Sequence, residues 1–376
     1  MHLLSDILGR PAAAIDTPAL VIDLDAMERN LERMAAFAAQ HDVMLRPHAK
    51  MHKSATLARL QMARGAVGVC VQKTSEAEAL AALGVNNIYI SNEVVSPFKL
   101  KRVVTVAREL QALGGQLAIA VDSAEGLRRL AQAAHGQPAA LLRVFIEIDV
   151  GHGRCGVAPG PAAVALADEL AVHPALQFGG LQAYHGRAQH LRTVAERQAA
   201  IAQVITHVQT TRAALQAAGH AVPLVTGAGT GTFALETASG VYGELQAGSY
   251  LFMDRDYADN ERDPAQPQFE HALFVKSQVM SVCASHAVVD AGHKSHAIDS
   301  GLPAVHGLAL DYANGGDEHG ILRGAQLPAL GDTVWLIPGH CDPTINLHEH
   351  LLGVRGGLEH GTVEQIIRVD ARGALT

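Results

Sequence analysis

Short apolar runs alternate with amphipathic segments along residues 42–248 of the 376-residue chain. The amphipathic segments, among them 75–83, 123–134 and 161–172, place apolar residues at the i, i+3 and i+4 spacing of helices. The apolar runs between them have the length and composition of buried strands, and they predict eight, at 43–46, 67–71, 87–91, 117–122, 143–150, 178–184, 224–227 and 244–247. Ser54 and Ser123 stand where two helices should begin, because serine is a favoured helix cap.

Eight strand–helix alternations over about 200 residues favour an α/β fold, a (β/α)8 barrel of the TIM type. A doubly wound open sheet is the alternative, since the pattern does not itself show that the sheet closes. In a barrel, binding and catalytic side chains gather at the carboxyl ends of the strands. The residues that follow each predicted strand are therefore the candidates for chemistry.

A separate strand and helix precede the barrel pattern. Residues 19–24 predict the strand, and the helix follows from Asp25, with Glu28 at the spacing of a capping box. The apolar stripe of this helix consists of Met27, Leu31, Met34 and Ala38.

Long helical patterns end near residue 250, and short strands with glycine-rich turns replace them, at 272–281, 287–290, 333–337 and 364–369. This change predicts a C-terminal β domain. We expect an N-terminal segment of residues 1–24 that joins the β domain of residues 253–376, and a barrel formed by residues 25–252.

Composition narrows the possible partners. The net charge of −8 argues against nucleic acid, whose phosphates require basic surfaces. No apolar stretch approaches the roughly 20 residues of a membrane helix. The N-terminus lacks a basic region and carries Asp6 in its apolar patch, so we expect no signal peptide and a cytoplasmic protein. The 4 cysteines are widely spaced and indicate neither a disulfide framework nor a CxxC metal site.

The first candidate site is RPHAKMHK, residues 46–53, after the first barrel strand. A lysine at this end of a barrel strand points into the site, and among apolar groups it can lose its proton and form an imine with a carbonyl cofactor. Lys50 is the candidate. A solvated basic loop that binds phosphate is an equally good interpretation of the motif alone.

Two further motifs follow later strands. In DVGHGRCGV, the glycines let Arg154 return over the strand end and donate to an anionic ring oxygen, although a surface arginine is the simpler interpretation. In GLQAYHGRAQH, Tyr184 could stack on a flat ring, while His185 and His190 are candidate bases. The alternative there is an aromatic residue of the barrel interior followed by a polar helix start.

Two glycine-rich turns, VTGAGTGTF and LQAGSY, follow the last two predicted strands. Barrels commonly hold a phosphate there on backbone N–H groups. Phosphate binding is favoured over a purely structural turn. The residues expected to take part are Gly229, Thr230, Gly231, Gly248 and Ser249.

The β region contains PGHCDPTINLHEH, in which His340 and Asp342 would project to the same side of an extended chain. An imidazole and a carboxylate suit Mn²⁺, Mg²⁺ or Zn²⁺ and leave open positions for water and substrate. A buried, hydrogen-bonded pair is the alternative, because the spacing alone is a weak signal.

Together, these motifs resemble the fold-type III pyridoxal 5′-phosphate (PLP) enzymes, and within them the D-threonine aldolase and D-serine dehydratase family. The resemblance runs from DTPALVIDLDAMERNL to HCDPT. It implies that Lys50 is the Schiff-base lysine, that Arg154 contacts the phenolic oxygen, and that Tyr184 packs near the pyridine ring. The glycine-rich turns would hold the phosphate, and His340 with Asp342 would bind the divalent metal, with Mn²⁺ favoured.

The resemblance also implies a reaction. Dehydratases of this group carry cysteine where this chain has Asp342, so we expect retro-aldol cleavage of D-3-hydroxy amino acids to glycine and an aldehyde. His190 is our first choice of base. The alternatives are a D-serine or D-3-hydroxyaspartate dehydratase, a 3-hydroxy-D-aspartate aldolase, and a non-catalytic PLP carrier. A homodimer is implied, in which residues 317–320 would reach a neighbouring site.

Overall fold

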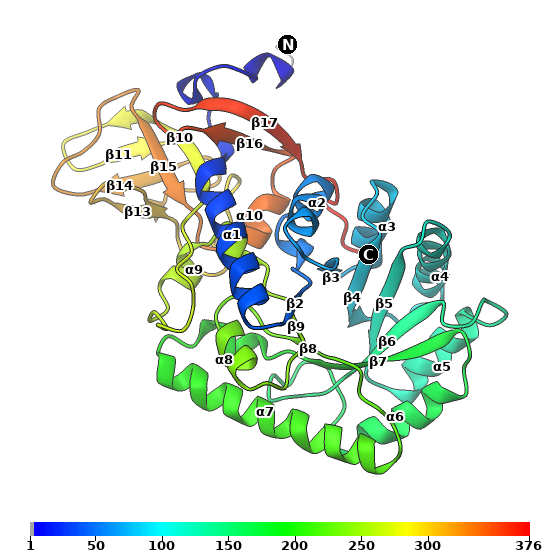
Figure 1. Cartoon of the computed structure of the whole chain (residues 1–376). Helices are drawn as coiled ribbons and strands as arrows, with labels where there is room; N and C mark the ends of the chain where they lie inside the picture. Colours follow the sequence, from blue (N-terminus) through cyan, green and yellow to red (C-terminus); the bar gives the residue numbers. More distant parts are fainter. Residues whose placement is uncertain (1–3) are drawn as a thin grey trace.

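The computed structural model describes residues 4–376, which form a barrel of eight parallel strands and a sheet of nine strands beside it (Figure 1). The first three residues of the predicted N-terminal segment lie outside the described residues. Between residues 4 and 376, no helix combines the length and the hydropathy needed to cross a bilayer.

The barrel strands follow one another in the spatial order β2-β9-β8-β7-β6-β5-β4-β3. Closure occurs just after β2, where His48 bridges Cys70 and the Val67 N–H donates to the Leu45 carbonyl at 2.8 Å. The predicted barrel is thereby confirmed over the doubly wound sheet. Its strands, each within a few residues of the predicted bounds, are β2 (Met44–Leu45), β3 (Val69–Val71), β4 (Asn87–Glu93), β5 (Gln116–Val121), β6 (Leu142–Glu147), β7 (Leu176–Ala183), β8 (Val225–Gly227) and β9 (Glu244–Leu245).

Helices cover the outside of the barrel because each presents an apolar face to the strands. Ser123 caps its helix, accepting a hydrogen bond from the Gly126 N–H at 3.2 Å, whereas Ser54 precedes its helix without a side-chain cap. The helices are α1 (Leu24–Gln40), α2 (Ala55–Ala63), α3 (Thr74–Ala82), α4 (Pro97–Ala112), α5 (Ala124–Ala133), α6 (Pro161–Ala171), α7 (Val194–Ala217) and α8 (Phe233–Ala238).

The predicted capping box at the start of α1 is wrong. The helix begins one residue earlier, so its cap is Asp23, which accepts a hydrogen bond from the Ala26 N–H at 3.0 Å. Asp25 and Glu28 instead form ion pairs with Arg355, at 2.9 and 2.8 Å. They fasten the helix to the β sheet.

The second sheet includes the N-terminal strand, which pairs antiparallel with β10 and parallel with β16. The chain therefore leaves this sheet to build the barrel and then returns to it. Strands β12, β13, β14 and β16 are additional to those predicted. The strands are β1 (Ala19–Asp23), β10 (Leu273–Val282), β11 (Ala287–Val289), β12 (Ala304–Val305), β13 (Asp311–Asn314), β14 (Gly320–Arg323), β15 (Thr333–Ile337), β16 (His350–Arg355) and β17 (Thr362–Arg368).

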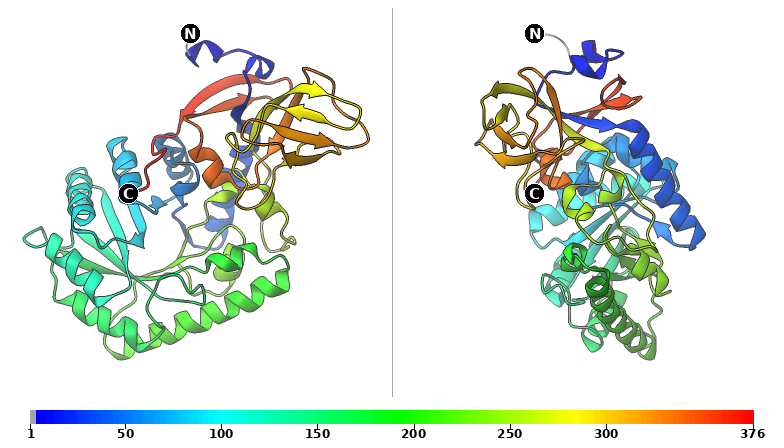
Figure 2. Two further views of the ribbon diagram at one scale, coloured as in Figure 1. Left: turned by 180° about the vertical axis from the view of Figure 1, so that it is seen from behind. Right: turned by 90° about the vertical axis from the view of Figure 1, so that its left-hand side faces the viewer.

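Barrel and sheet share one apolar core, which includes Met27, Tyr250, Leu273 and Leu336. Figure 2 shows the sheet from two further sides, remote from the long helix α7 on the barrel's far side. Two short helices connect the parts: α9 (Arg255–Ala258), which follows the barrel, and α10 (Cys341–Asn346), which contacts the 3-10 helix η3 (Ala49–Met51). This last contact places residues of the sheet region beside the end of β2.

Candidate active site

A cavity of about 360 Å³ opens at the carboxyl ends of the barrel strands, and we call it the active-site cavity. It brings together nine of the predicted site residues. Its lining consists of His48, Lys50, Met51, Gln72, Ser91, His152, Arg154, Gln182, Tyr184, Gly186, Arg187, His190, Ala228, Gly229, Thr230, Gln246, Gly248, Ser249, Tyr257 and Asp342.

Lys50 enters this cavity from η3, where the His48 ring accepts a hydrogen bond from the Lys50 N–H at 3.4 Å. The Lys50 Nζ lies 2.8 Å from Oδ1 of Asp342. This carboxylate raises the pKa of Lys50, because it stabilises the ammonium more than burial penalises it. The expected apolar surroundings are therefore wrong: the amine is charged here, and an anion holds it.

Arg154 and Tyr184 lie face to face in the cavity. The guanidinium carbon is 5.8 Å from the centroid of the tyrosine ring, within the range of a cation–π contact. A second contact, 3.7 Å between Nη2 of Arg154 and Oε1 of Glu147, ties the guanidinium to the end of β6. The two residues predicted to flank the cofactor ring are thus brought together.

The buried carboxyl group of Glu147 should make the stability of the fold depend on pH. Its side chain is 4% exposed, and burial, with the neighbouring Glu93 carboxylate, raises its pKa from 4.5 to about 9. The folded chain therefore retains a proton that the unfolded chain releases, so its stability should fall as pH rises from about 5 to 9. Linkage limits this fall to about 1.4 kcal/mol per pH unit.

Glu147→Gln keeps a neutral side chain with no proton to lose. We expect the variant to gain stability relative to the wild type as pH rises from 6 to 9, as urea midpoints at matched cofactor content would measure. Parallel pH curves for the two proteins would show that Glu147 titrates normally.

The two glycine-rich turns meet at the cavity. Thr230, in the first turn, accepts a hydrogen bond at Oγ1 from the N–H of Tyr250, the last residue of the second. Gly248 is required by close approach, since a Cβ there would lie 2.7 Å from the His48 carbonyl oxygen. Gly229 and Gly248 both line the cavity, so their backbone N–H groups can come near a ligand.

Gly231 does not belong to this cavity. Its N–H donates to Oε1 of Gln189 at 2.9 Å, and the residue lines a different, larger cavity of about 840 Å³ between barrel and sheet. Its N–H is already engaged, so the structure does not support the predicted phosphate contact at this residue.

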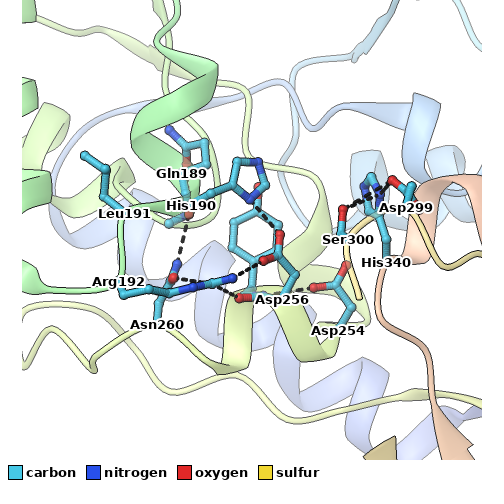
Figure 3. A network of polar contacts seen from close by, with 12 residues as sticks. Gln189, His190, Leu191, Arg192, Asp254, Asp256, Asn260, Asp299, Ser300 and His340 are labelled. Atoms are coloured by element: carbon cyan, nitrogen blue, oxygen red, sulfur yellow. Dashed lines mark hydrogen bonds and ion pairs between the residues drawn. The ribbon is translucent and has the colours of Figure 1, made fainter. Parts of the chain in front are cut away.

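His340 and Asp342 come together, although not in the extended chain that we predicted. His340 directly precedes α10 and Asp342 lies in its first turn, with Nε2 of His340 and Oδ2 of Asp342 3.7 Å apart. The other imidazole nitrogen of His340 lies 2.7 Å from Asp299 (Figure 3). Cys341 points elsewhere, with its Sγ donating to the Met253 carbonyl. A cation placed between the histidine and the aspartate would meet one nitrogen and one oxygen donor.

Of the two candidate bases, His190 lines the cavity. Its Nδ1 lies 2.6 Å from Oδ2 of Asp256, a buried carboxylate that also binds Arg192 at 2.5 Å (Figure 3). His185 instead accepts a hydrogen bond from the Ala188 N–H at 3.2 Å and caps the following turn. The geometry therefore separates the two histidines.

Comparison with known proteins now gives the family. Residues 22–256 match the family model described as the alanine racemase N-terminal domain. The chain belongs to the alanine racemase-like family. Residues 272–354 match a serine dehydratase domain, so both parts agree with the predicted membership in the fold-type III group.

Members of this family that act on D-amino acids are similar to the chain along its length. A D-threonine aldolase from Arthrobacter sp is 46% identical over 370 residues, 97% of this chain and 95% of the relative. A 3-hydroxy-D-aspartate aldolase from Paracoccus denitrificans is 42% identical, over 97% and 94%. The crystal structure of D-threonine aldolase from Filomicrobium marinum has a TM-score of 0.93 at 46% identity, covering 98% of this chain and 99% of that one.

The alanine racemase-like cavity also contains residues that the sequence analysis did not single out. His48 is half-buried, and its loss of contact with water lowers its pKa well below the usual range and leaves it neutral; its ring contacts Gln72 at 2.8 Å. Gln246 donates to Gln182 at 2.7 Å. All four of these residues lie on a predicted strand or within two residues of its end. That position is the only sequence signal that could have identified them.

Proposed function

We propose that this chain is a PLP- and divalent-metal-dependent aldolase, which cleaves D-threonine and related D-3-hydroxy amino acids to glycine and an aldehyde. One observation carries the proposal: the Lys50 amine of the barrel and the Asp342 carboxylate of the β region meet at 2.8 Å in a cavity beside two glycine-rich turns. The 46% identity to a D-threonine aldolase supports it and makes the chain a carbon–carbon lyase.

The cavity residues fit PLP. The volume of about 360 Å³ suits a small ligand. Lys50 offers a primary amine for the cofactor aldehyde, Arg154 a donor for the ring hydroxyl, and Tyr184 an aromatic face. The phosphate would be held by Gly229, Thr230, Gly248 and Ser249. When bound, PLP supplies the electron sink for the carbanion that remains after the carbon–carbon bond breaks.

The donor set of His340 and Asp342 fits a divalent cation, and its oxygen ligand favours Mn²⁺ or Mg²⁺ over Zn²⁺. A bound metal would lower the pKa of the substrate's β-hydroxyl. In this structure the Lys50 ammonium lies against Oδ1 of Asp342, whereas Oδ2 is the oxygen that faces His340. A cation between His340 and Asp342 would therefore meet the carboxylate oxygen that Lys50 does not hold.

The chain's own residues then handle the proton. His190 lines the cavity together with Asp342 and Lys50, and its Nδ1 is engaged by Asp256. The opposite ring nitrogen, Nε2, is the atom available to accept the β-hydroxyl proton. Arg154 and Tyr184 would hold the bound ring from its edge and its face, and so would orient the substrate relative to the ring.

An acidic substrate is the second candidate, because Arg187 and His152 also line the cavity. An exposed guanidinium at this position could pair with the second carboxylate of a 3-hydroxy-D-aspartate. The 42% identity to a 3-hydroxy-D-aspartate aldolase supports this variant of the same reaction. The dehydratase alternatives are less favoured, since Asp342 replaces the cysteine expected in them.

We further propose that the protein is a cytoplasmic homodimer. Its four cysteines are free, which suits a reducing compartment. Residues 317–320, which the resemblance would direct towards a partner's site, pair within their own chain: Asp317 and Glu318 contact Lys294 at 3.3 and 2.7 Å.

The test is product analysis with and without metal. Enzyme loaded with PLP and stripped by EDTA should be inactive, and Mn²⁺ should restore formation of glycine and acetaldehyde from D-threonine. Parallel assays with D-serine and D-3-hydroxyaspartate would separate the alternatives. An α-keto acid product would identify a dehydratase, and PLP absorbance without EDTA-sensitive turnover would identify a carrier.

A further inference from the structure

The carboxylate of Asp256 lies beneath His190 and is engaged on both oxygens (Figure 3). Oδ2 lies 2.6 Å from Nδ1 of His190, and Oδ1 accepts a hydrogen bond from Nη2 of Arg192 at 2.5 Å. The residue is 6% exposed, so these contacts replace water. Burial alone would raise the pKa of Asp256, but its hydrogen bonds with His190 and Arg192 lower it overall, and the group is ionised.

An ionised carboxylate can only accept hydrogen bonds. The hydrogen between Asp256 and His190 therefore belongs to Nδ1 of the imidazole. In the neutral ring the opposite nitrogen, Nε2, then carries a lone pair and no hydrogen. A cavity-lining histidine in this tautomer can take a proton at Nε2.

Arg192 fixes the other side of the arrangement. Its Nη1 donates to the Asp256 carbonyl oxygen at 2.5 Å and to Oδ1 of Asn260 at 2.7 Å. Asn260 in turn donates to the Gln189 carbonyl at 2.9 Å, next to His190 in the chain. A guanidinium has donors only, so whatever atom occupies the Oδ1 position of residue 256 must be an acceptor.

We propose that Asp256 is a positioning residue that selects the Nδ1-protonated tautomer of His190, with Arg192 fixing which oxygen of the carboxylate performs this task. The proposal rests on the proposed role of His190 as the base. It adds a requirement that the hydrogen of the neutral His190 ring be on Nδ1, which neither the motif nor the cavity lining specifies.

Asp256→Asn gives a specific test, because Arg192 decides how the new amide is oriented. The amide oxygen must face Arg192, which places the NH₂ group against Nδ1 of His190. Nδ1 then has to accept, so the hydrogen moves to Nε2 and the base is lost. We expect kcat of the PLP- and Mn²⁺-loaded enzyme to fall roughly 100-fold, within the range of a lost general base, with little change in KM.

Asp256→Ala is the informative comparison. It removes the carboxylate without imposing a tautomer, so we expect it to retain a higher kcat than Asp256→Asn among correctly folded, PLP-loaded protein. A merely structural role predicts the reverse order, because asparagine preserves shape. Asp259→Asn is the matched control: this exposed carboxylate lies 3.6 Å from Arg255, and its loss should leave kcat unchanged.

Imidazole ¹⁵N NMR of the holoenzyme reads the tautomer without relying on turnover. The signal that disappears in His190→Gln identifies His190. Its protonated nitrogen should be Nδ1 in the wild type and Nε2 in Asp256→Asn. An unchanged tautomer, or an Asp256→Ala enzyme slower than Asp256→Asn, would overturn the inference. Full activity of His190→Gln would instead show that the proposed base is wrong, whatever the tautomer.

Discussion

Replacing Lys50 by alanine is expected to reduce D-threonine cleavage by more than about 10⁴-fold, because the variant has no amine with which to hold the cofactor covalently. The purified protein should lose the visible absorbance of the wild type. Borohydride treatment of the wild type should fix the cofactor to one peptide, and that peptide should contain Lys50.

Lys50→Arg separates the covalent role from the ionic one, and Lys73→Ala is a control for the choice of lysine. In the wild type the Lys50 amine pairs with Asp342 at 2.8 Å. Lys50→Arg keeps a cation near Asp342, but a guanidinium cannot form the imine, so this variant should be as inactive as the alanine variant. Lys73→Ala, at the start of α3, should behave as wild type. Cofactor recovered on Lys53 or Lys73 would refute the assignment.

Replacing Asp342 by alanine should lower kcat by about 10³-fold, because a metal that activates the β-hydroxyl acts mainly in the transition state. PLP should remain bound, since the residues proposed to hold it lie in the barrel. Added Mn²⁺ should no longer stimulate the variant. EDTA-treated wild type, whose activity Mn²⁺ should restore, is the reference for this measurement.

Because Asp342 also pairs with Lys50, its loss could act through the amine and not the metal. Asp342→Cys distinguishes these effects. A thiolate is a softer ligand, so this variant should shift its preference from Mn²⁺ towards Zn²⁺ while it keeps a metal. Metal content measured by mass spectrometry, with PLP absorbance from the same samples, would decide. EDTA-treated wild type that still cleaves D-threonine at full rate would show that His340 and Asp342 are structural.

The barrel and most of its site could be predicted because the determining signals are local. Strand ends, glycine turns and the lysine after β2 each lie within a short stretch of sequence. Where contacts span the chain, prediction failed. Asp25 and Glu28 have the spacing of a capping box, yet Arg355, more than 320 residues away, binds both. Nothing near them in the sequence indicates that partner.

The site shows the same limit. Asp342 was predicted from a spacing that assumed an extended chain, whereas the segment is helical and comes to Lys50 through the contact of α10 with η3. Asp256 was missed because nothing in its sequence neighbourhood points to His190, 66 positions earlier. Gly231 was included because a glycine-rich turn does not show which N–H group is already engaged.

The contact of α10 with η3 brings together two parts of the chain that would have different roles in the proposed enzyme. The barrel would contribute the cofactor amine and its phosphate turns, and the returning β region the metal donors. Substitutions confined to α10 and the residue before it could then change which metal binds, and with it whether the β-hydroxyl is deprotonated or leaves. The residues proposed to hold PLP would stay the same. The type of reaction would then depend on the last third of the chain. Exchanging residues 339–346 between relatives could transfer it from one enzyme to another.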